Sequence, residues 1–167
     1  MPEFRYILGQ IIAFTIFAFG LGYFSTSPSY TYHDPEKALI MVSFSHASER
    51  KEECRRFTQE ELAKLAPNMR RPLDCPRERV PLHVEITLDG TSLLSQSYNP
   101  TGLARDGSAS VYERIPVAPG QHQLIAKLRD SSRETGFDYE REETIKLDSK
   151  QLFVIDFRKE LNGFYFQ

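Results

Sequence analysis

The stretch LHVEITLDGTSLLSQSY, residues 82–98, decides the fold. Apolar residues at positions 82, 84, 86 and 88 alternate with polar ones at the positions between them. Because successive side chains of a strand point to opposite faces, this alternation predicts a strand with one buried face. Asp89-Gly90 follows directly and signals a turn, after which residues 92–98 return as the second strand of a hairpin.

Strand-like segments extend to both sides of this hairpin. Residues 38–46, ALIMVSFSH, form a short run rich in β-branched and aromatic residues, which is typical of a strand. Further strands are expected at residues 110–117, 121–129, 137–147 and 151–158. Seven short strands separated by turn signals predict a mainly β chain that forms an antiparallel β-sandwich with one short helical insertion.

The helical insertion is expected over residues 48–66. Thr58 is followed three residues later by Glu61, which is the spacing of a capping box, and Pro67 ends the run. Residues 68–79, NMRRPLDCPRER, are expected to form an irregular loop because prolines interrupt them.

Residues 6–24 read YILGQIIAFTIFAFGLGYF and are clearly polar only at Gln10 and Thr15. As a helix they span about 28 Å, which is close to the hydrocarbon thickness of a bilayer. A cleaved signal peptide would have a shorter apolar stretch and a more basic start than one with Glu3 beside Arg5. The sequence therefore predicts a retained signal-anchor.

The predicted organisation has three parts: residues 1–24 form a cytoplasmic tip and transmembrane anchor, 25–35 a linker, and 36–167 an extracytoplasmic β-sandwich domain. The charges that flank the anchor give only a weak orientation signal. The long folded tail, which holds both cysteines, favours a cytoplasmic N-terminus and a periplasmic domain at a bacterial inner membrane.

Small residues recur at a spacing of four in the anchor, where Gly9 pairs with Ala13 and Ala18 with Gly22. Such pairs let a second helix approach closely, and Gln10 is able to donate a hydrogen bond between helices. The alternative interpretation is that these residues reflect the ordinary composition of membrane helices, and that the anchor only tethers the domain.

Three stretches of the chain are similar to the PEGA-type family of small β-modules: VEITLDG, IPVAPGQHQLIAKLRD and YEREETIKLDSKQLFVIDF. The matching places are residues 84–90, Pro119-Gly120, His122, Leu124 and Ala126, with residues 98–109 resembling an insertion. The resemblance covers residues 80–158 and is shared by immunoglobulin-like sandwiches. It implies a compact, non-catalytic β-module of the cell envelope that is joined to membrane proteins.

Cys54 and Cys75 are the two cysteines, and outside the cytoplasm a disulfide between them is the expected state. It would add about 3 kcal/mol by restricting the unfolded chain. The alternative is a metal site that adds His46 or His33 to the two cysteines, but the short paired spacing of zinc ligands is absent. Thiol–disulfide exchange would favour C-x-x-C, which is also absent.

The 167 residues include 21 Lys and Arg against 23 Asp and Glu, so no basic excess exists to attract nucleic acid. The sequence contains no G-x-S-x-G, Walker or H-E-x-x-H motif, and its histidines stand alone. Glu142 and Glu143 are adjacent on a predicted strand and point to opposite faces. We therefore expect no enzyme activity, no cofactor and no metal.

Two groups of residues are candidates for docking a partner. The first is the arginine pairs Arg55-Arg56 and Arg70-Arg71, since arginine suits bidentate pairing with carboxylates; the alternative is a solvated charged face. The second is the terminal run Phe164, Tyr165 and Phe166, which is expected either to close the domain's own sandwich or to insert into a partner or the membrane interface.

These features predict a non-catalytic, single-pass accessory subunit of a larger inner-membrane complex, a respiratory one in its most concrete form. The expected partners are the lipid bilayer and other integral membrane subunits. Two alternatives stay open: a tethered envelope-binding module for peptidoglycan, polysaccharide or a soluble ligand, and an assembly factor for a metal or redox complex.

Overall fold

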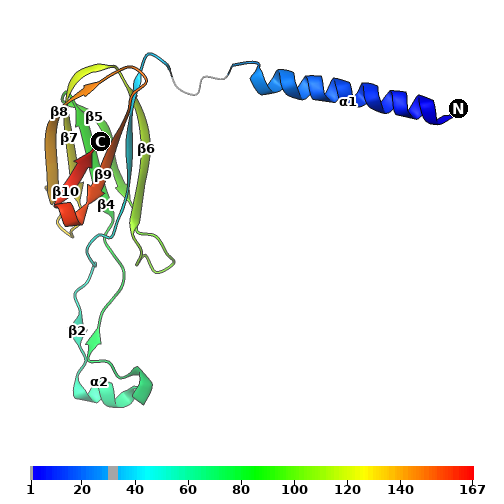
Figure 1. Ribbon diagram of the computed structural model, residues 1–167. Helices are drawn as coiled ribbons and strands as arrows, with labels where there is room; N and C mark the ends of the chain where they lie inside the picture. The colour runs from blue at the N-terminus through cyan, green and yellow to red at the C-terminus, as the bar shows by residue number, and fades with distance from the viewer. Residues whose placement is uncertain (1, 30–33) are drawn as a thin grey trace. The chain divides into compact units, whose positions relative to one another are not determined.

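The computed structural model describes residues 2–29 and 34–167 (Figure 1). The chain divides into two compact units, residues 1–34 and 35–167, which are described separately. In the first unit, helix α1 spans Pro2–Thr26. Its segment Glu3–Thr26 is long and apolar enough to cross a membrane by length and composition. The apolar helix expected at residues 6–24 is confirmed, with a few more residues at each end.

Within the described residues the second unit is mainly β, and eight of its strands form two four-stranded sheets (Figure 1). The first sheet has the order β10 (Gly163–Phe166), β9 (Leu152–Arg158), β1 (Ala38–His46) and β6 (Ala109–Val117). The second has the order β5 (Thr91–Tyr98), β4 (Leu82–Leu88), β7 (Gly120–Arg129) and β8 (Tyr139–Leu147). The predicted antiparallel sandwich is confirmed.

The alternating strands supply the core of the sandwich. Leu82, Val84 and Ile86 of β4 are fully buried, and Ile40 and Val42 of β1 are fully buried in the other sheet. Each such side chain contributes about 1.5–3 kcal/mol by leaving water. The core therefore lies between the two sheets, on the faces that the period of two marks.

Two features of the sheets differ from the simplest expectation. Strand β9 pairs with β1 in parallel, with Leu39 opposite Leu152. The turn after β8 carries the chain from the second sheet to the first, where β9 runs beside β1 in the same direction. The terminal residues also form an eighth strand, β10, which pairs antiparallel with β9.

The helix expected over residues 48–66 is wrong in its extent, because α2 spans only Gln59–Lys64. Residues 48–56 offer no aliphatic or aromatic side chain that a helix could bury, and instead the chain is extended with a two-residue strand, β2 (Arg55–Arg56). The expected loop over residues 68–79 contains the end of a 3-10 turn, η1 (Pro67–Met69), and β3 (Leu73–Asp74).

Candidate functional site

Residues 50–79 form an arm that leaves the sandwich between β1 and β4 (Figure 1). The outgoing and returning segments of the arm run antiparallel. Arg50 and Arg79 form a β-bridge, and the N–H of Lys51 donates to the carbonyl of Glu78 over 2.9 Å. Strands β2 and β3 pair farther along. The arm is thus a long hairpin whose far part, residues 55–74, we call the tip.

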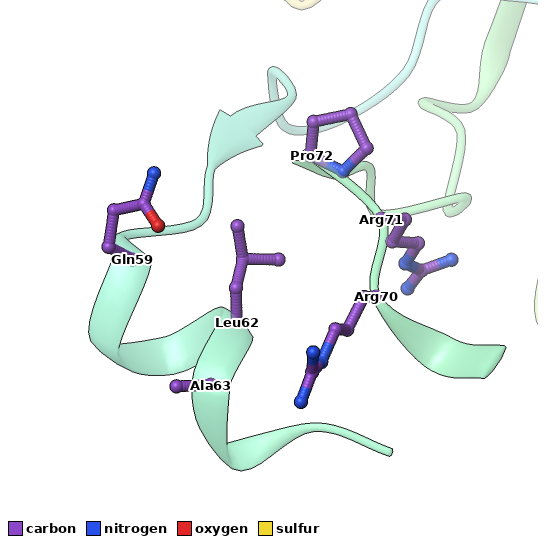
Figure 2. Close-up of a pocket in the computed structure, with 6 residues that line it drawn as sticks. All are labelled: Gln59, Leu62, Ala63, Arg70, Arg71 and Pro72. Atoms are coloured by element: carbon purple, nitrogen blue, oxygen red, sulfur yellow. The ribbon is translucent and has the colours of Figure 1, made fainter. Parts of the chain in front are cut away.

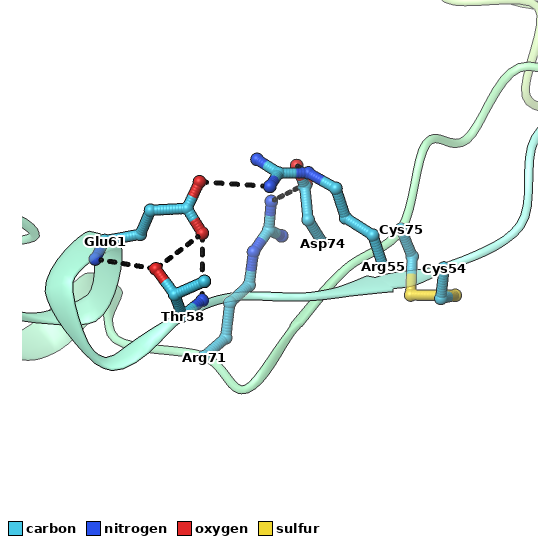
Figure 3. Close-up of polar contacts among 7 residues, drawn as sticks. All are labelled: Cys54, Arg55, Thr58, Glu61, Arg71, Asp74 and Cys75. Carbon is cyan, nitrogen blue, oxygen red and sulfur yellow. Dashed lines mark hydrogen bonds and ion pairs between the residues drawn. A yellow bond between two sulfur atoms is a disulfide. The ribbon is translucent and has the colours of Figure 1, made fainter.

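Cys54 and Cys75 form a disulfide across the arm, directly before the β2–β3 pair (Figure 3). The disulfide joins the outgoing and returning segments of the arm where the tip begins. It therefore closes the tip into a loop, as the cysteine count predicts. Two cysteine sulfurs joined in this way are not thiolates, so they do not serve as the metal ligands of the alternative interpretation.

The root of the arm is fastened to the sandwich by hydrogen bonds. The buried hydroxyl of Ser48 donates to the carbonyl of Val80. The guanidinium of Arg79 donates to the carbonyl of Ser48 and, over 3.0 Å, to the carbonyl of Asp106 in the loop before β6. These contacts fix where the arm starts and leave the tip to its own local interactions.

The tip is organised by the capping box that the sequence predicts (Figure 3). The N–H of Glu61 donates to Thr58 Oγ1 over 3.3 Å, and the N–H of Thr58 donates to Glu61 Oε2 over 2.9 Å. These two bonds satisfy backbone groups that the first turn of a helix leaves unpaired. They explain why a helix of only six residues begins at Gln59.

Arg55 and Arg71 are held by carboxylates inside the tip (Figure 3). Arg55 Nη1 lies 3.1 Å from Glu61 Oε1, and its Nε lies 3.5 Å from Asp74 Oδ2. Arg71 Nη2 lies 3.4 Å from Asp74 Oδ1. The hydrogen bond and charge of Glu61 raise the pKa of Arg55, while the Thr58 N–H and then Arg55 lower the pKa of Glu61. Two of the four candidate arginines therefore stabilise the tip.

The other two arginines, Arg56 and Arg70, form no ion pair among the described residues. Both are exposed, and Arg70 Nε donates only to the carbonyl of Leu65, over 3.1 Å. Their charges are therefore available to a partner.

The tip has no core of its own. No residue of α2 or η1 is buried, Met69 is 65% exposed and Leu73 is 42% exposed. Figure 2 shows a hollow between α2 and the chain that follows η1, with Leu62 pointing into it and Arg70 beside it. The hollow is lined by Gln59, Leu62, Ala63, Arg70, Arg71 and Pro72.

The tip differs in charge from the whole protein. It carries five basic side chains against three carboxylates, a net charge of +2, while the complete sequence carries −2. An exposed, locally cationic and partly apolar surface on an otherwise slightly acidic protein has the composition of a protein contact.

The histidines have structural partners. His46 is buried and its Nε2 lies 2.7 Å from Asp130 Oδ2. His83 Nδ1 lies 3.0 Å from Ser97 Oγ, and His122 Nδ1 lies 2.6 Å from Asp89 Oδ2. The His122 contact, followed by the Gln123 N–H, lowers the pKa of Asp89. His33 lies outside the described residues, among which no group of three or more His, Cys, Asp or Glu side chains is placed to hold a metal.

The terminal aromatic residues divide between the core and the surface. Phe164 is 5% exposed and packs against Phe44 and Phe157, while Phe166 packs against Phe153 and is half-buried. Tyr165 is 41% exposed. The tail thus closes the domain's own sandwich, which leaves Tyr165 as the member of the run with an open face.

The small residues of α1 lie on two faces of the helix. Ala18 lies nine positions after Gly9, which is about two and a half turns, so the pair Gly9–Ala13 and the pair Ala18–Gly22 face opposite directions. A hollow on the helix surface is lined by Ala18, Phe19, Gly22 and Tyr23. Gln10 belongs to neither face.

Sequence reasoning overlooks the buried pair His46–Asp130, although the signal is present. His46 continues the inward series of Val42 and Phe44, and Asp130 continues that of Ala126 and Leu128. Two ionisable residues at inward positions on strand ends require each other as partners. It also overlooks the exposure of Met69 and Leu73.

The fold and the arm define a class: a β-sandwich with an apolar N-terminal helix and a disulfide-closed arm. No protein-family model, no curated protein and no solved structure matches this chain.

Proposed function

We propose that this protein is a non-catalytic, single-pass, membrane-anchored accessory subunit of a larger inner-membrane complex, whose periplasmic β-sandwich presents the arm to a partner protein. The observation that carries the proposal is the arm: a disulfide-closed hairpin whose tip has no buried residue in α2 or η1. Ordering such a segment costs conformational entropy, and burial within the domain offsets little of that cost. A partner that covers the tip would supply the missing stabilisation.

The disulfide also supports the proposed compartment. Disulfides persist in oxidising compartments such as the bacterial periplasm and are rare in the cytosol. The cysteines lie at positions 54 and 75, on the C-terminal side of α1. A periplasmic domain consequently requires a cytoplasmic N-terminus, which is the topology proposed here.

The anchor contributes contacts of its own in this proposal. Because the two pairs of small residues face opposite directions, two neighbouring helices of integral membrane subunits have room to pack against α1. The rest of its surface faces lipid. The anchor would then sit between subunits and not at the margin of the complex.

The linker and the arm join the sandwich at different ends of β1. The chain enters β1 at Ala38, and the arm begins just after β1 ends at His46. Nine strand residues span about 30 Å. The arm therefore starts at the opposite end of the sandwich from the entry of the linker.

The PEGA resemblance belongs to this proposal too, since it implies a non-catalytic envelope module. The turn Asp89-Gly90 joins β4 to β5, and Pro119-Gly120 leads into β7, which are the local arrangements that the resemblance requires. The sandwich acts in this view as a support that holds the arm and β10, with no reaction of its own.

The experiment that tests the proposal is purification of the full-length tagged chain from membranes in a mild detergent. We expect integral membrane proteins to co-purify in fixed stoichiometry. Recovery of the chain as a monomer without partners, from its native host at native expression level, would contradict the proposal. Labelling of a cysteine placed at the exposed Thr135 with an impermeant reagent reports the topology, and labelling only after cell lysis would contradict a periplasmic domain.

A further inference from the structure

We infer that the tip of the arm binds an acidic segment of the partner protein, one that places an apolar side chain between carboxylates. This inference rests on the proposed function, since it names the chemistry of the partner that the arm meets. It is carried by the positions of Arg56 and Arg70 on either side of an apolar strip.

The four arginines of the tip differ in whether they pair with a carboxylate. Arg55 and Arg71 are neutralised by Glu61 and Asp74, whereas Arg56 and Arg70 pair with no carboxylate among the described residues. Guanidinium groups bind carboxylates by two parallel hydrogen bonds, which gives direction as well as attraction. The two uncommitted arginines are thus the groups that select an anion.

The second step is the apolar strip between them. The hollow beside Arg70 and a second hollow beside Arg56 share Gln59, Leu62 and Pro72. The second hollow is lined by Arg56, Phe57, Gln59, Leu62, Pro72 and Leu73. Leu62 and Pro72 therefore lie at the centre of a continuous surface with a cation at each end, and Figure 2 shows the opening at the Arg70 end.

The third step is the identity of the anion. A polypeptide segment offers two carboxylates and one apolar side chain in a single extended run, which matches a strip with cations at both ends. Anionic lipid headgroups would favour a dense basic cluster, but the tip interleaves its arginines with three carboxylates.

The test is peptide binding to the full-length protein in nanodiscs of zwitterionic lipid, measured by fluorescence anisotropy. The probe is a short labelled peptide with Asp-Glu-Leu-Glu-Asp at its centre. Two comparison peptides replace the leucine by serine or the four carboxylates by their amides. We expect the parent peptide to bind best, and we expect its binding to weaken as salt is added.

The variant R56E/R70E reverses the two selecting charges and is expected to weaken binding of the acidic peptide about tenfold or more. The control K146E/K159E makes the same change in net charge at exposed lysines of the sandwich and is expected to bind within about twofold of the wild type. Circular dichroism and an intact disulfide in both variants show that a loss of binding is not a loss of folding.

Several outcomes would overturn the inference. One is equal binding of the acidic and amide peptides, and another is an equal loss of peptide binding in R56E/R70E and K146E/K159E. A third is that the peptide does not bind, while the protein binds vesicles of phosphatidylglycerol and R56E/R70E abolishes that binding. Concentration-dependent dimerisation that competes with the peptide would assign the tip to a second copy of this chain. If partners co-purify equally with wild type and R56E/R70E, the inference fails while the proposed function stands.

Discussion

His46 Nε2 lies 2.7 Å from Asp130 Oδ2, and the two side chains are only 7% and 6% exposed. His46 ends β1 in the first sheet, and Asp130 follows β7 in the second, so the contact joins the two sheets. The ring of Phe157 covers the histidine at a centroid distance of 4.8 Å. The carbonyl of Asp130 also accepts the N–H of Glu49, directly before the arm. The pair therefore holds the sandwich together at the root of the arm.

Replacing Asp130 by Leu is expected to destabilise the domain by about 2–4 kcal/mol, because it leaves a buried imidazole without its partner. The double variant H46L/D130L removes both polar groups and is expected to recover part of this loss. Thermal unfolding of the β signal in circular dichroism measures both. A double variant that is less stable than D130L alone would contradict the pairing.

The sandwich can be predicted from the sequence because apolar side chains recur at every second residue of a strand with one buried face. Residues 82–88 show this period and residues 38–46 form an apolar run rich in β-branched and aromatic residues, and the structure begins and ends strands at those residues. The capping box at Thr58 is local in the same way, since it depends only on residues three apart. Both signals report short-range geometry, which a single sequence contains.

The arm and the parallel pair could not be predicted, because they depend on which distant segments meet. Arg55 lies opposite Asp74 although 18 residues separate them, and no period of the sequence records that pairing. The charged residues around them suit a solvated helix equally well. The distinction between paired and uncommitted arginines likewise appears only once β2 and β3 lie side by side.

The variant C54S/C75S is expected to unfold the tip while the sandwich stays folded. The tip has no buried residue in α2 or η1. Besides the disulfide, a pair of two-residue strands, β2 and β3, holds its two segments together. Brief trypsin treatment should cleave the variant between residues 55 and 71 before it cleaves the wild type. The β signal should keep its midpoint within a few degrees. Equal resistance of the tip in both proteins would show that the disulfide is not what orders it.

Asp138 should make the domain sensitive to acid. Its carboxylate accepts hydrogen bonds from Ser131 Oγ over 2.8 Å and from the N–H groups of Asp130 and Ser131. Burial alone would raise its pKa, but these bonds together with Arg133 lower it below the ordinary value. A depressed pKa stabilises the fold above the unfolded value of about 3.9, and that contribution is lost as the pH falls through the folded pKa.

The variant D138N is accordingly expected to be less stable than the wild type at pH 7, and by a smaller margin at about pH 2. Thermal midpoints at the two pH values give the comparison. The matched variant D148N alters a carboxylate whose side chain is 78% exposed, and it should change the midpoint little at either pH. A D138N deficit that stays constant from neutral to acid would assign the effect to packing and not to charge.

Adjacent residues of β10 should differ widely in their contribution to stability. Phe164 packs against Phe44 and Phe157, so F164A is expected to cost about 3–5 kcal/mol. Tyr165 points outward, and Y165A is expected to cost less than about 1 kcal/mol. Chemical denaturation of both variants measures the difference. Comparable losses would mean that the tail is held by something other than its inward face.

The two faces of α1 give a prediction about the assembly itself. If the proposed subunit packs between two neighbouring helices, then bulky residues on one face should disturb one neighbour and leave the other in place. The variant G9L/A13L fills the first face, and A18L/G22L fills the second, half a turn away. Mass spectrometry of the purified complex should show loss of a different subunit in each case.

The control is Leu21→Phe, which adds bulk on neither face and should leave the composition of the complex unchanged. Each of the four small side chains lies in the segment that is apolar enough to cross a membrane, and leucine is itself apolar, so the substitutions alter shape without opposing insertion. If both double variants keep every subunit, the helix only tethers the domain. If both lose the same subunit, one neighbour with several helices contacts both faces of α1, and the prediction of two partners is wrong. Loss of distinct subunits therefore identifies α1 as a spacer between two partners.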